Sequence, residues 1–164
     1  MKKFILVALL VLPMSMFAQK FAHVNTEEVI KAMPEYSKAM EEMQKMQKDI
    51  QDELARMQSE IQTKADELQK NPPTVETIKQ RKEQEVQDLY QRYQQFLQTS
   101  DQELQKAQQE KTQPIFTKVQ NAIKELGTAG GYIYIMDVTS GIPFINETLS
   151  TNITSQLKTK LGIK

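Results

Sequence analysis

The sequence predicts a mostly helical α+β protein in which a small β-containing body carries one long antiparallel helical hairpin. The stretch from Tyr36 to Glu125 contains no glycine and is interrupted only at Asn71-Pro72-Pro73. Its apolar residues recur with gaps of about three and four, which places them on one narrow stripe of an α-helix and does not fit a strand. Most other residues are Gln, Glu, Lys and Asp; the first three favour helix, and none of the four needs burial.

The apolar stripe predicts where the two arms of the hairpin meet. Gln47, Lys82, Ser100 and Lys111 occupy the stripe positions that lack an apolar residue. On the first arm the stripe comprises Tyr36, Met40, Met43, Ile50, Leu54, Met57, Ile61, Ala65 and Leu68. On the second arm it comprises Val75, Ile78, Val86, Leu89, Tyr93, Phe96, Leu104, Ala107, Ile115, Val119, Ala122 and Leu126.

The prolines set the turn of the hairpin, which we expect to cover residues 36–126 with the turn at 71–73. A residue before proline avoids the helical region, and proline lacks the N–H donor, so the first helix must stop there. Thr74 is the expected N-cap of the return arm. At 1.5 Å per residue the first arm is roughly 50 Å long, so the hairpin projects from the body.

Residues 1–18 have the composition of a cleavable secretory signal peptide. Met1-Lys2-Lys3 is basic, Phe4 to Leu12 is apolar, and a cleavage site precedes Gln19. Export from the cytoplasm is the prediction, and the absence of cysteine excludes a disulfide framework or a lipidated cysteine anchor. Without the two N-terminal lysines the chain has 19 basic and 21 acidic residues, mixed along both arms, which argues against nucleic acid as a partner.

Residues 19–35 and 127–164 are expected to form one α/β body for oligomerisation. Asn25 with Glu28 predicts a capped short helix, and Pro34 suits the first turn of the long helix. A body of about 54 residues is marginal by itself, and its edge strands need covering, so we expect a homo-oligomer. The expected elements of the body are a strand at 20–24, a helix at 26–32, strands at 132–138 and 142–145, and a helix from about 151.

The sequence contains no catalytic or metal-binding constellation, so we expect neither an enzyme nor a bound cofactor or metal. His23 is the single histidine and lies in an apolar strand, where packing explains it. Asp137 precedes Thr-Ser-Gly and is interpreted as a turn former. The glycines from Gly127 to Gly131 follow a helix and precede a strand, which is the wrong order for a phosphate-binding loop.

Four side chains of the hairpin are candidates for contact with a partner. Methionine suits surfaces that bind varied partners, but Met43 lies in the stripe and is also explained by packing, whereas Met46 lies beside the stripe. Folding the hairpin at its prolines places Phe96 opposite Gln47, where the stripe is thin, and Tyr90 flanks it. The candidate contact residues are therefore Met46, Tyr90, Met43 and Phe96.

The tip of the hairpin is weakly basic, and two interpretations remain open. A solvated helix end explains the charges, while the alternative is transient contact with acidic partners or lipid headgroups at a membrane surface. The basic residues are Lys64, Lys70, Lys79, Arg81 and Lys82, against Asp66, Glu67 and Glu76.

The order of these parts resembles the Skp/OmpH periplasmic chaperones over essentially the whole mature chain. The resemblance is carried by Phe-Ala-His-Val-Asn at 21–25, Pro34-Glu-Tyr36, the Gln/Glu/Lys-rich hairpin, Gly131 to Asp137 and Asn152 to Ile163. It implies a homotrimer whose strands join in a central body, with three hairpins enclosing a cavity. It also implies ATP-independent holding of unfolded outer-membrane β-barrel proteins.

The best-known members of that family are strongly basic, whereas this chain is about neutral, so no ligand-binding residue is transferred from them. Client contact here is expected to depend on apolar and amphipathic side chains multiplied by three arms. The rival interpretation is a structural coiled-coil protein of the envelope whose hairpin docks one defined partner. A holdase binds many unfolded proteins, whereas a structural protein binds one folded protein.

Overall fold

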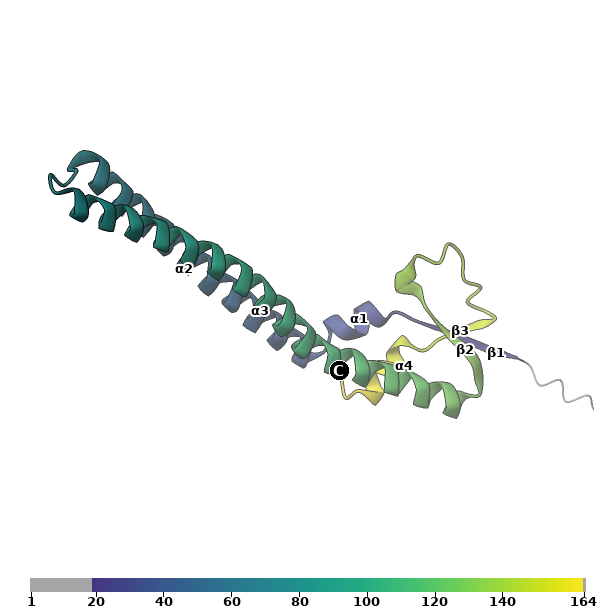
Figure 1. The fold of residues 1–164 in the computed structure, drawn as a ribbon. Helices are drawn as coiled ribbons and strands as arrows, with labels where there is room; N and C mark the ends of the chain where they lie inside the picture. Colours follow the sequence, from purple (N-terminus) through teal and green to yellow (C-terminus); the bar gives the residue numbers. More distant parts are fainter. Residues whose placement is uncertain (1–18, 164) are drawn as a thin grey trace, which may run out of the picture.

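The computed structural model describes residues 19–163, and it contains the predicted hairpin and a small three-stranded sheet. The predicted signal peptide at 1–18 lies outside the described residues. Helix α2 spans Pro34–Lys70 and helix α3 spans Glu76–Gly130. Figure 1 shows the two arms side by side, projecting from the body at one end of the molecule. Among residues 19–163, no helix is both long and apolar enough to cross a membrane.

The arms are joined by a narrow apolar seam and by ion pairs across it. Ile61 of α2 and Leu89 of α3 are buried in the seam, as is the small polar residue Ser100. Most other stripe residues of the hairpin are half-buried, because each arm has one neighbour and the rest of its surface faces water. Three inter-arm ion pairs join Lys64 to Glu85 at 3.0 Å, Lys118 to Glu35 at 2.7 Å and Lys111 to Glu42.

Acid should weaken the hairpin through these three pairs. In each pair the lysine donates a hydrogen bond that holds the pKa of the glutamate below its usual value of 4.5. A carboxyl group with a lowered pKa stabilises the fold above its unfolded pKa, and that contribution is lost as the pH falls through the folded pKa. The thermal midpoint should therefore be flat near neutral pH and fall modestly below pH 4.5, because water screens exposed pairs.

Circular dichroism melts of the whole protein across this range measure the effect. As a control, the double variant Lys64→Gln, Lys118→Gln should melt earlier at neutral pH and respond less to acid. A variant as sensitive to acid as the wild-type chain would contradict the assignment of the effect to these pairs.

The turn between the arms lies where it was predicted, but the N-cap of the second arm is one residue later than expected. Helix α2 ends at Lys70, as the two prolines require, and residues 71–75 connect the arms. The N-cap of α3 is Val75 rather than Thr74, and no side-chain hydrogen bond caps this helix. The expectation for Thr74 is therefore wrong, and the first N–H groups of α3 are left to water at the exposed tip.

The sheet has β1 (Lys20–Val24) at its centre, with β2 (Tyr132–Asp137) and β3 (Ser150–Asn152) on either side. Both neighbours run parallel to β1. Helix α1 (Thr26–Lys31) follows β1, a 3-10 turn η2 (Val138–Ser140) follows β2, and α4 (Thr154–Lys160) ends the described fold. Asn25 caps α1 by accepting a hydrogen bond from the N–H of Glu28, as predicted.

The core of the body lies between one face of the sheet and the helices. Because α3 continues beyond the start of α2, its last third enters the body and packs there (Figure 1). The core joins residues from β1, α1, α2, α3 and α4 into one cluster. Its buried members are Ala22, Val24, Val29, Ile30, Met33, Ala39, Ile115, Val119, Ala122, Ile153 and Leu157.

One predicted strand and two predicted helix boundaries in the body are wrong. Residues 142–145 form an irregular loop rather than a strand, and the third strand is Ser150–Asn152. The terminal helix begins at Thr154 rather than near Thr151, because residues 150–152 are extended beside β1. Helix α3 continues past Gly127 and stops at Gly130, where Gly131 has φ +65°, a left-handed conformation that favours glycine.

Candidate functional site

Two of the predicted contact residues, Met46 of α2 and Phe96 of α3, lie together in an open groove along the hairpin. Ile50 joins them, so the groove has an apolar floor built from both arms. Its volume is about 350 Å³. Its lining residues define the hairpin groove: Glu42, Lys45, Met46, Asp49, Ile50, Phe96 and Glu103.

Helical spacing explains how the groove forms. On α2 the lining residues fall at intervals of three and four from Glu42 to Ile50, which places them on one face. On α3, Phe96 and Glu103 are two turns apart, with Ser100 between them in the same row. Ser100 is 3% exposed and has a short side chain, so it fills less of the seam than the leucines elsewhere in the stripe. The groove therefore lies beside a short seam residue.

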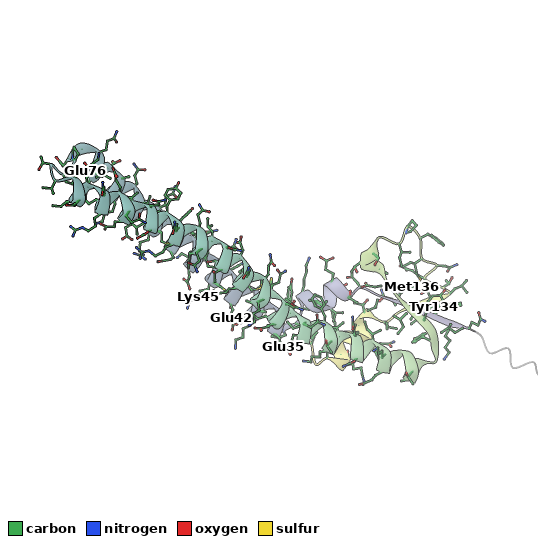
Figure 2. All side chains as sticks on the ribbon, viewed as in Figure 1. Glu35, Glu42, Lys45, Glu76, Tyr134 and Met136 are labelled. Carbon is green, nitrogen blue, oxygen red and sulfur yellow. The ribbon has the colours of Figure 1, made fainter. Side chains whose placement is uncertain are left out.

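The rim of the groove carries more negative than positive charge. Lys111 donates a hydrogen bond to Glu42, and this bond lowers the pKa of the Glu42 carboxyl. Within residues 19–163, neither Asp49 nor Glu103 takes part in an ion pair. Figure 2 shows Glu42 and Lys45 on the body-side half of the hairpin, well away from the tip at Glu76.

Tyr90 forms a second, separate surface on α3. Its side chain is 56% exposed, and its ring contacts Tyr93 edge to face with centroids 6.5 Å apart. The hollow beside it is lined by Glu83, Val86, Tyr90 and the glutamines Gln87, Gln91 and Gln94. The structure thus exposes Tyr90 and does not bring it into the hairpin groove.

Met43, the fourth predicted contact residue, is half-buried and does not line the groove. Met43 is half-buried because it belongs to the apolar stripe along which the two arms pack. The residues that sequence reasoning missed are Ile50 and the charged rim, which includes Asp49 and Glu103. Asp49 and Ile50 lie three and four residues after Met46, but this spacing was not a distinctive signal, because charged residues at this spacing are also typical of any solvated helix face. Glu103 lies on the other arm.

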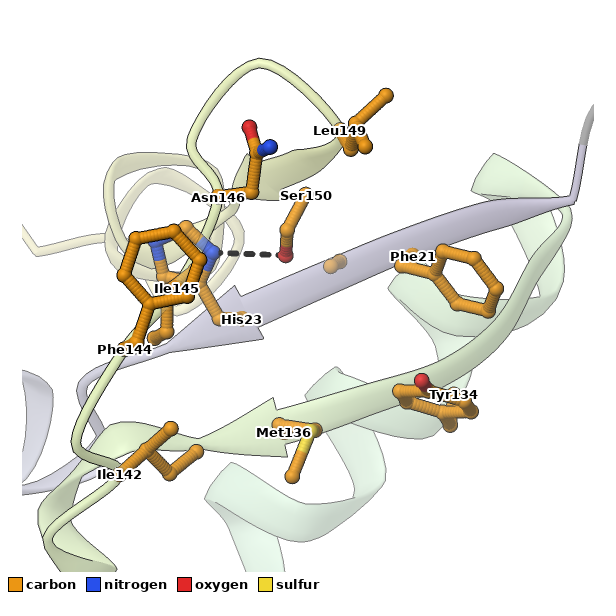
Figure 3. Close-up of a pocket in the computed structure, with 11 residues that line it drawn as sticks. Phe21, His23, Tyr134, Met136, Ile142, Phe144, Ile145, Asn146, Leu149 and Ser150 are labelled. Atoms are coloured by element: carbon orange, nitrogen blue, oxygen red, sulfur yellow. Dashed lines mark hydrogen bonds between the residues drawn. The ribbon is translucent and has the colours of Figure 1, made fainter.

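A third surface lies on the body, on the face of the sheet opposite the core. Phe21 and Tyr134 stack there with ring centroids 4.9 Å apart. The loop at 141–149 lies beside this face, and its residues line a cavity of about 200 Å³ together with Phe21 and Tyr134 (Figure 3). Phe144 and Leu149 of this loop are 77% and 72% exposed. We call the group Phe21, Tyr134, Met136, Phe144 and Leu149 the sheet patch.

The polar side chains of His23 and Asp137, both at the sheet, are hydrogen-bonded within the fold. His23 is buried, and its Nδ1 forms a 2.9 Å hydrogen bond with Oγ of Ser150 (Figure 3). Burial raises the pKa of Asp137, but hydrogen bonds from Thr26 and Thr139 outweigh it and hold that pKa below its usual value. Within residues 19–163, no group of three His, Cys, Asp or Glu side chains is placed to hold a metal ion.

The comparison with protein families agrees with this architecture. The sequence model of the family described as outer membrane protein (OmpH-like) matches residues 20–161, which covers all three strands of the sheet and the whole hairpin. No curated protein matches the chain. Proteins of this family are periplasmic chaperones of outer-membrane proteins rather than enzymes. The chain therefore belongs to the OmpH-like family, and the resemblance found in the sequence is confirmed.

Proposed function

We propose that this protein is an ATP-independent periplasmic holdase that binds unfolded outer-membrane β-barrel proteins between the hairpins of a homotrimer. The observation that carries the proposal is the exposed, mixed surface of the hairpin, on which the groove at Met46 and the surface at Tyr90 lie apart. Small, shallow and separated contacts suit a partner without fixed structure, because each contact is weak and several together retain the chain.

The sheet patch supports the trimer. The small body has two edge strands, whose unpaired N–H and C=O groups can pair with another chain, and it exposes aromatic side chains. Copies of the body that join here would cover both. Three bodies joined in this way would carry three hairpins. We further propose that residues 1–18 direct export and that the hairpin tip, through its basic residues Lys64, Lys70, Lys79, Arg81 and Lys82, touches membrane surfaces transiently.

An aggregation-suppression assay tests the proposed function. An outer-membrane β-barrel protein is diluted from urea without ATP, and light scattering follows its aggregation. The trimer should suppress scattering at about equimolar concentration, and it should do so for several unrelated β-barrels. Suppression of none of them, together with tight binding of one folded envelope protein, would favour the rival role as a structural coiled-coil protein.

The double variant Met46→Ser, Tyr90→Ser should protect clients less well while keeping its helicity and mass. Met46 lines the open groove and Tyr90 is exposed, so neither change removes a buried seam residue such as Ile61. The double variant Gln58→Ser, Gln98→Ser changes two exposed residues outside both surfaces and is the matched control. High salt should leave most wild-type protection intact, because a near-neutral chain gains little from long-range attraction.

Protection that vanishes in moderate salt while the Met46→Ser, Tyr90→Ser variant behaves as wild type would show that capture is electrostatic. That pair of results would contradict the apolar mechanism without contradicting holdase activity itself.

A further inference from the structure

We infer that the hairpin groove selects one kind of client segment: an aromatic or bulky aliphatic side chain flanked by lysine or arginine. This inference rests on the proposed holdase function and assigns a ligand chemistry to the groove. It follows from three features of the groove, namely its floor, its rim and its contrast with the surface at Tyr90.

The floor accepts an apolar side chain. Met46, Ile50 and Phe96 form it, and the thioether of Met46 can adjust to residues of different shape. A volume of about 350 Å³ is at the lower end of the roughly 300–1,000 Å³ of small-ligand sites, which suits one large side chain rather than a folded element. An aromatic side chain gains most from such a site because it brings the largest apolar surface.

The rim favours positive charge beside that side chain. Three carboxylates and one ammonium group surround the floor, and the partner of Glu42 is Lys111. Asp49 and Glu103 lie on opposite arms, so the groove has an ion-pairing carboxylate on each side. A lysine or arginine of the client can lay its methylene stem on the apolar floor and direct its charge to either carboxylate. A flanking glutamate would meet like charge instead.

The surface at Tyr90 lacks a negatively charged rim of this kind. Glutamines dominate it, and Glu83 is its single charged member, so it should bind apolar segments with little preference for flanking charge. The chain as a whole is about neutral and exerts little long-range attraction on either sign of client. Any preference for basic flanks should therefore arise at the hairpin groove.

Methyl NMR of the full-length protein labelled at methionine tests this assignment. The Met46 signal is identified by its loss in Met46→Leu, and three unstructured Gly/Ser-rich peptides are titrated, with Lys-Phe-Lys, Glu-Phe-Glu or Lys-Ala-Lys at their centres. Lys-Phe-Lys should shift the Met46 signal with about three- to tenfold tighter binding than Glu-Phe-Glu, the range expected for one or two exposed ion pairs. Lys-Ala-Lys should bind more weakly than Lys-Phe-Lys.

The double variant Asp49→Asn, Glu103→Gln should reduce the preference for Lys-Phe-Lys to about twofold or less. Its matched control is Asp52→Asn, Asp101→Asn, which removes the same charge from exposed positions of the same helices outside the groove and should keep the preference. Equal binding of Lys-Phe-Lys and Glu-Phe-Glu by the wild-type protein would overturn the inference. So would an equal loss in the control, which would assign the preference to overall charge.

The outcomes separate this inference from the function on which it rests. If the wild-type protein suppresses β-barrel aggregation but shows no preference between the peptides, the inference fails and the holdase proposal stands. If it does not suppress aggregation, the holdase proposal fails whatever the peptides do.

Discussion

Replacing Leu157 with alanine should lower the free energy of unfolding of the body by about 2–5 kcal/mol, the usual cost of such a truncation in a packed core. Leu157 is 0% exposed and joins α4 to the cluster built from β1, α1 and α3. Domains are stable by only about 5–15 kcal/mol in total, so the variant should unfold at a much lower denaturant concentration. Urea titration followed by circular dichroism and by tyrosine fluorescence measures the loss.

Leu161→Ala is the matched control, because Leu161 packs at the edge of the same core and is half-buried. The same change should cost less there, since fewer contacts are lost and water can fill the space. An unfolding midpoint for Leu157→Ala equal to that of the wild-type protein would contradict the assignment of α4 to the core.

The double variant Phe144→Ser, Leu149→Ser should convert the proposed trimer into a folded monomer. Both side chains are more than 70% exposed in the single chain, so they contribute little to its own core. In the proposed trimer they would be buried, and buried apolar surface contributes roughly 25 cal/mol per Å². Light scattering should give one third of the wild-type mass, while circular dichroism should show unchanged helicity.

The control for this experiment is Val75→Ser, Ile78→Ser, which removes two exposed apolar side chains at the hairpin tip. It should keep the wild-type mass, because the tip is far from the sheet patch (Figure 2). A trimeric Phe144→Ser, Leu149→Ser variant would show that the chains associate through another surface.

The hairpin was predictable because its signal is long and redundant. Twenty-one stripe residues share one helical spacing, and the two prolines leave one place for the turn. The strand at Tyr132–Asp137 was equally clear, because alternating aromatic and β-branched residues follow a pair of glycines. These elements follow from local chemistry alone.

The C-terminal strand was missed because its sequence lacks a strand signature. Ser150, Thr151 and Asn152 contain no large apolar residue and are extended because β1 pairs with them. Ile142 to Ile145 has the composition of a strand, but Pro143 lacks an N–H donor and these residues instead form part of the loop beside the sheet. Tertiary pairing decided both cases, and a single sequence does not encode it locally.

Only the apolar residues of the hairpin groove were predictable, because only they had a local signal in the sequence. Met46 stood out because it is apolar and lies beside the stripe, and Phe96 because it faces a thin part of it. Asp49 and Glu103 had no such signal, since carboxylates on a long helix are usually solvated. The two join one groove only because the arms pack in a particular register, as the pair of Lys64 with Glu85 illustrates.

The central position of β1 has a consequence for how the chain folds. Its two neighbours begin more than a hundred residues later, at Tyr132 and Ser150, so the sheet cannot form until nearly the whole chain is available. The hairpin needs only contacts within and between its arms. Once the two arms have packed together, Glu35 lies beside Lys118. That contact closes most of the long loop between β1 and its partners, so pairing the strands afterwards costs less loop-closure entropy. A chain cut short before Ser150 would carry its arms but lack a complete sheet.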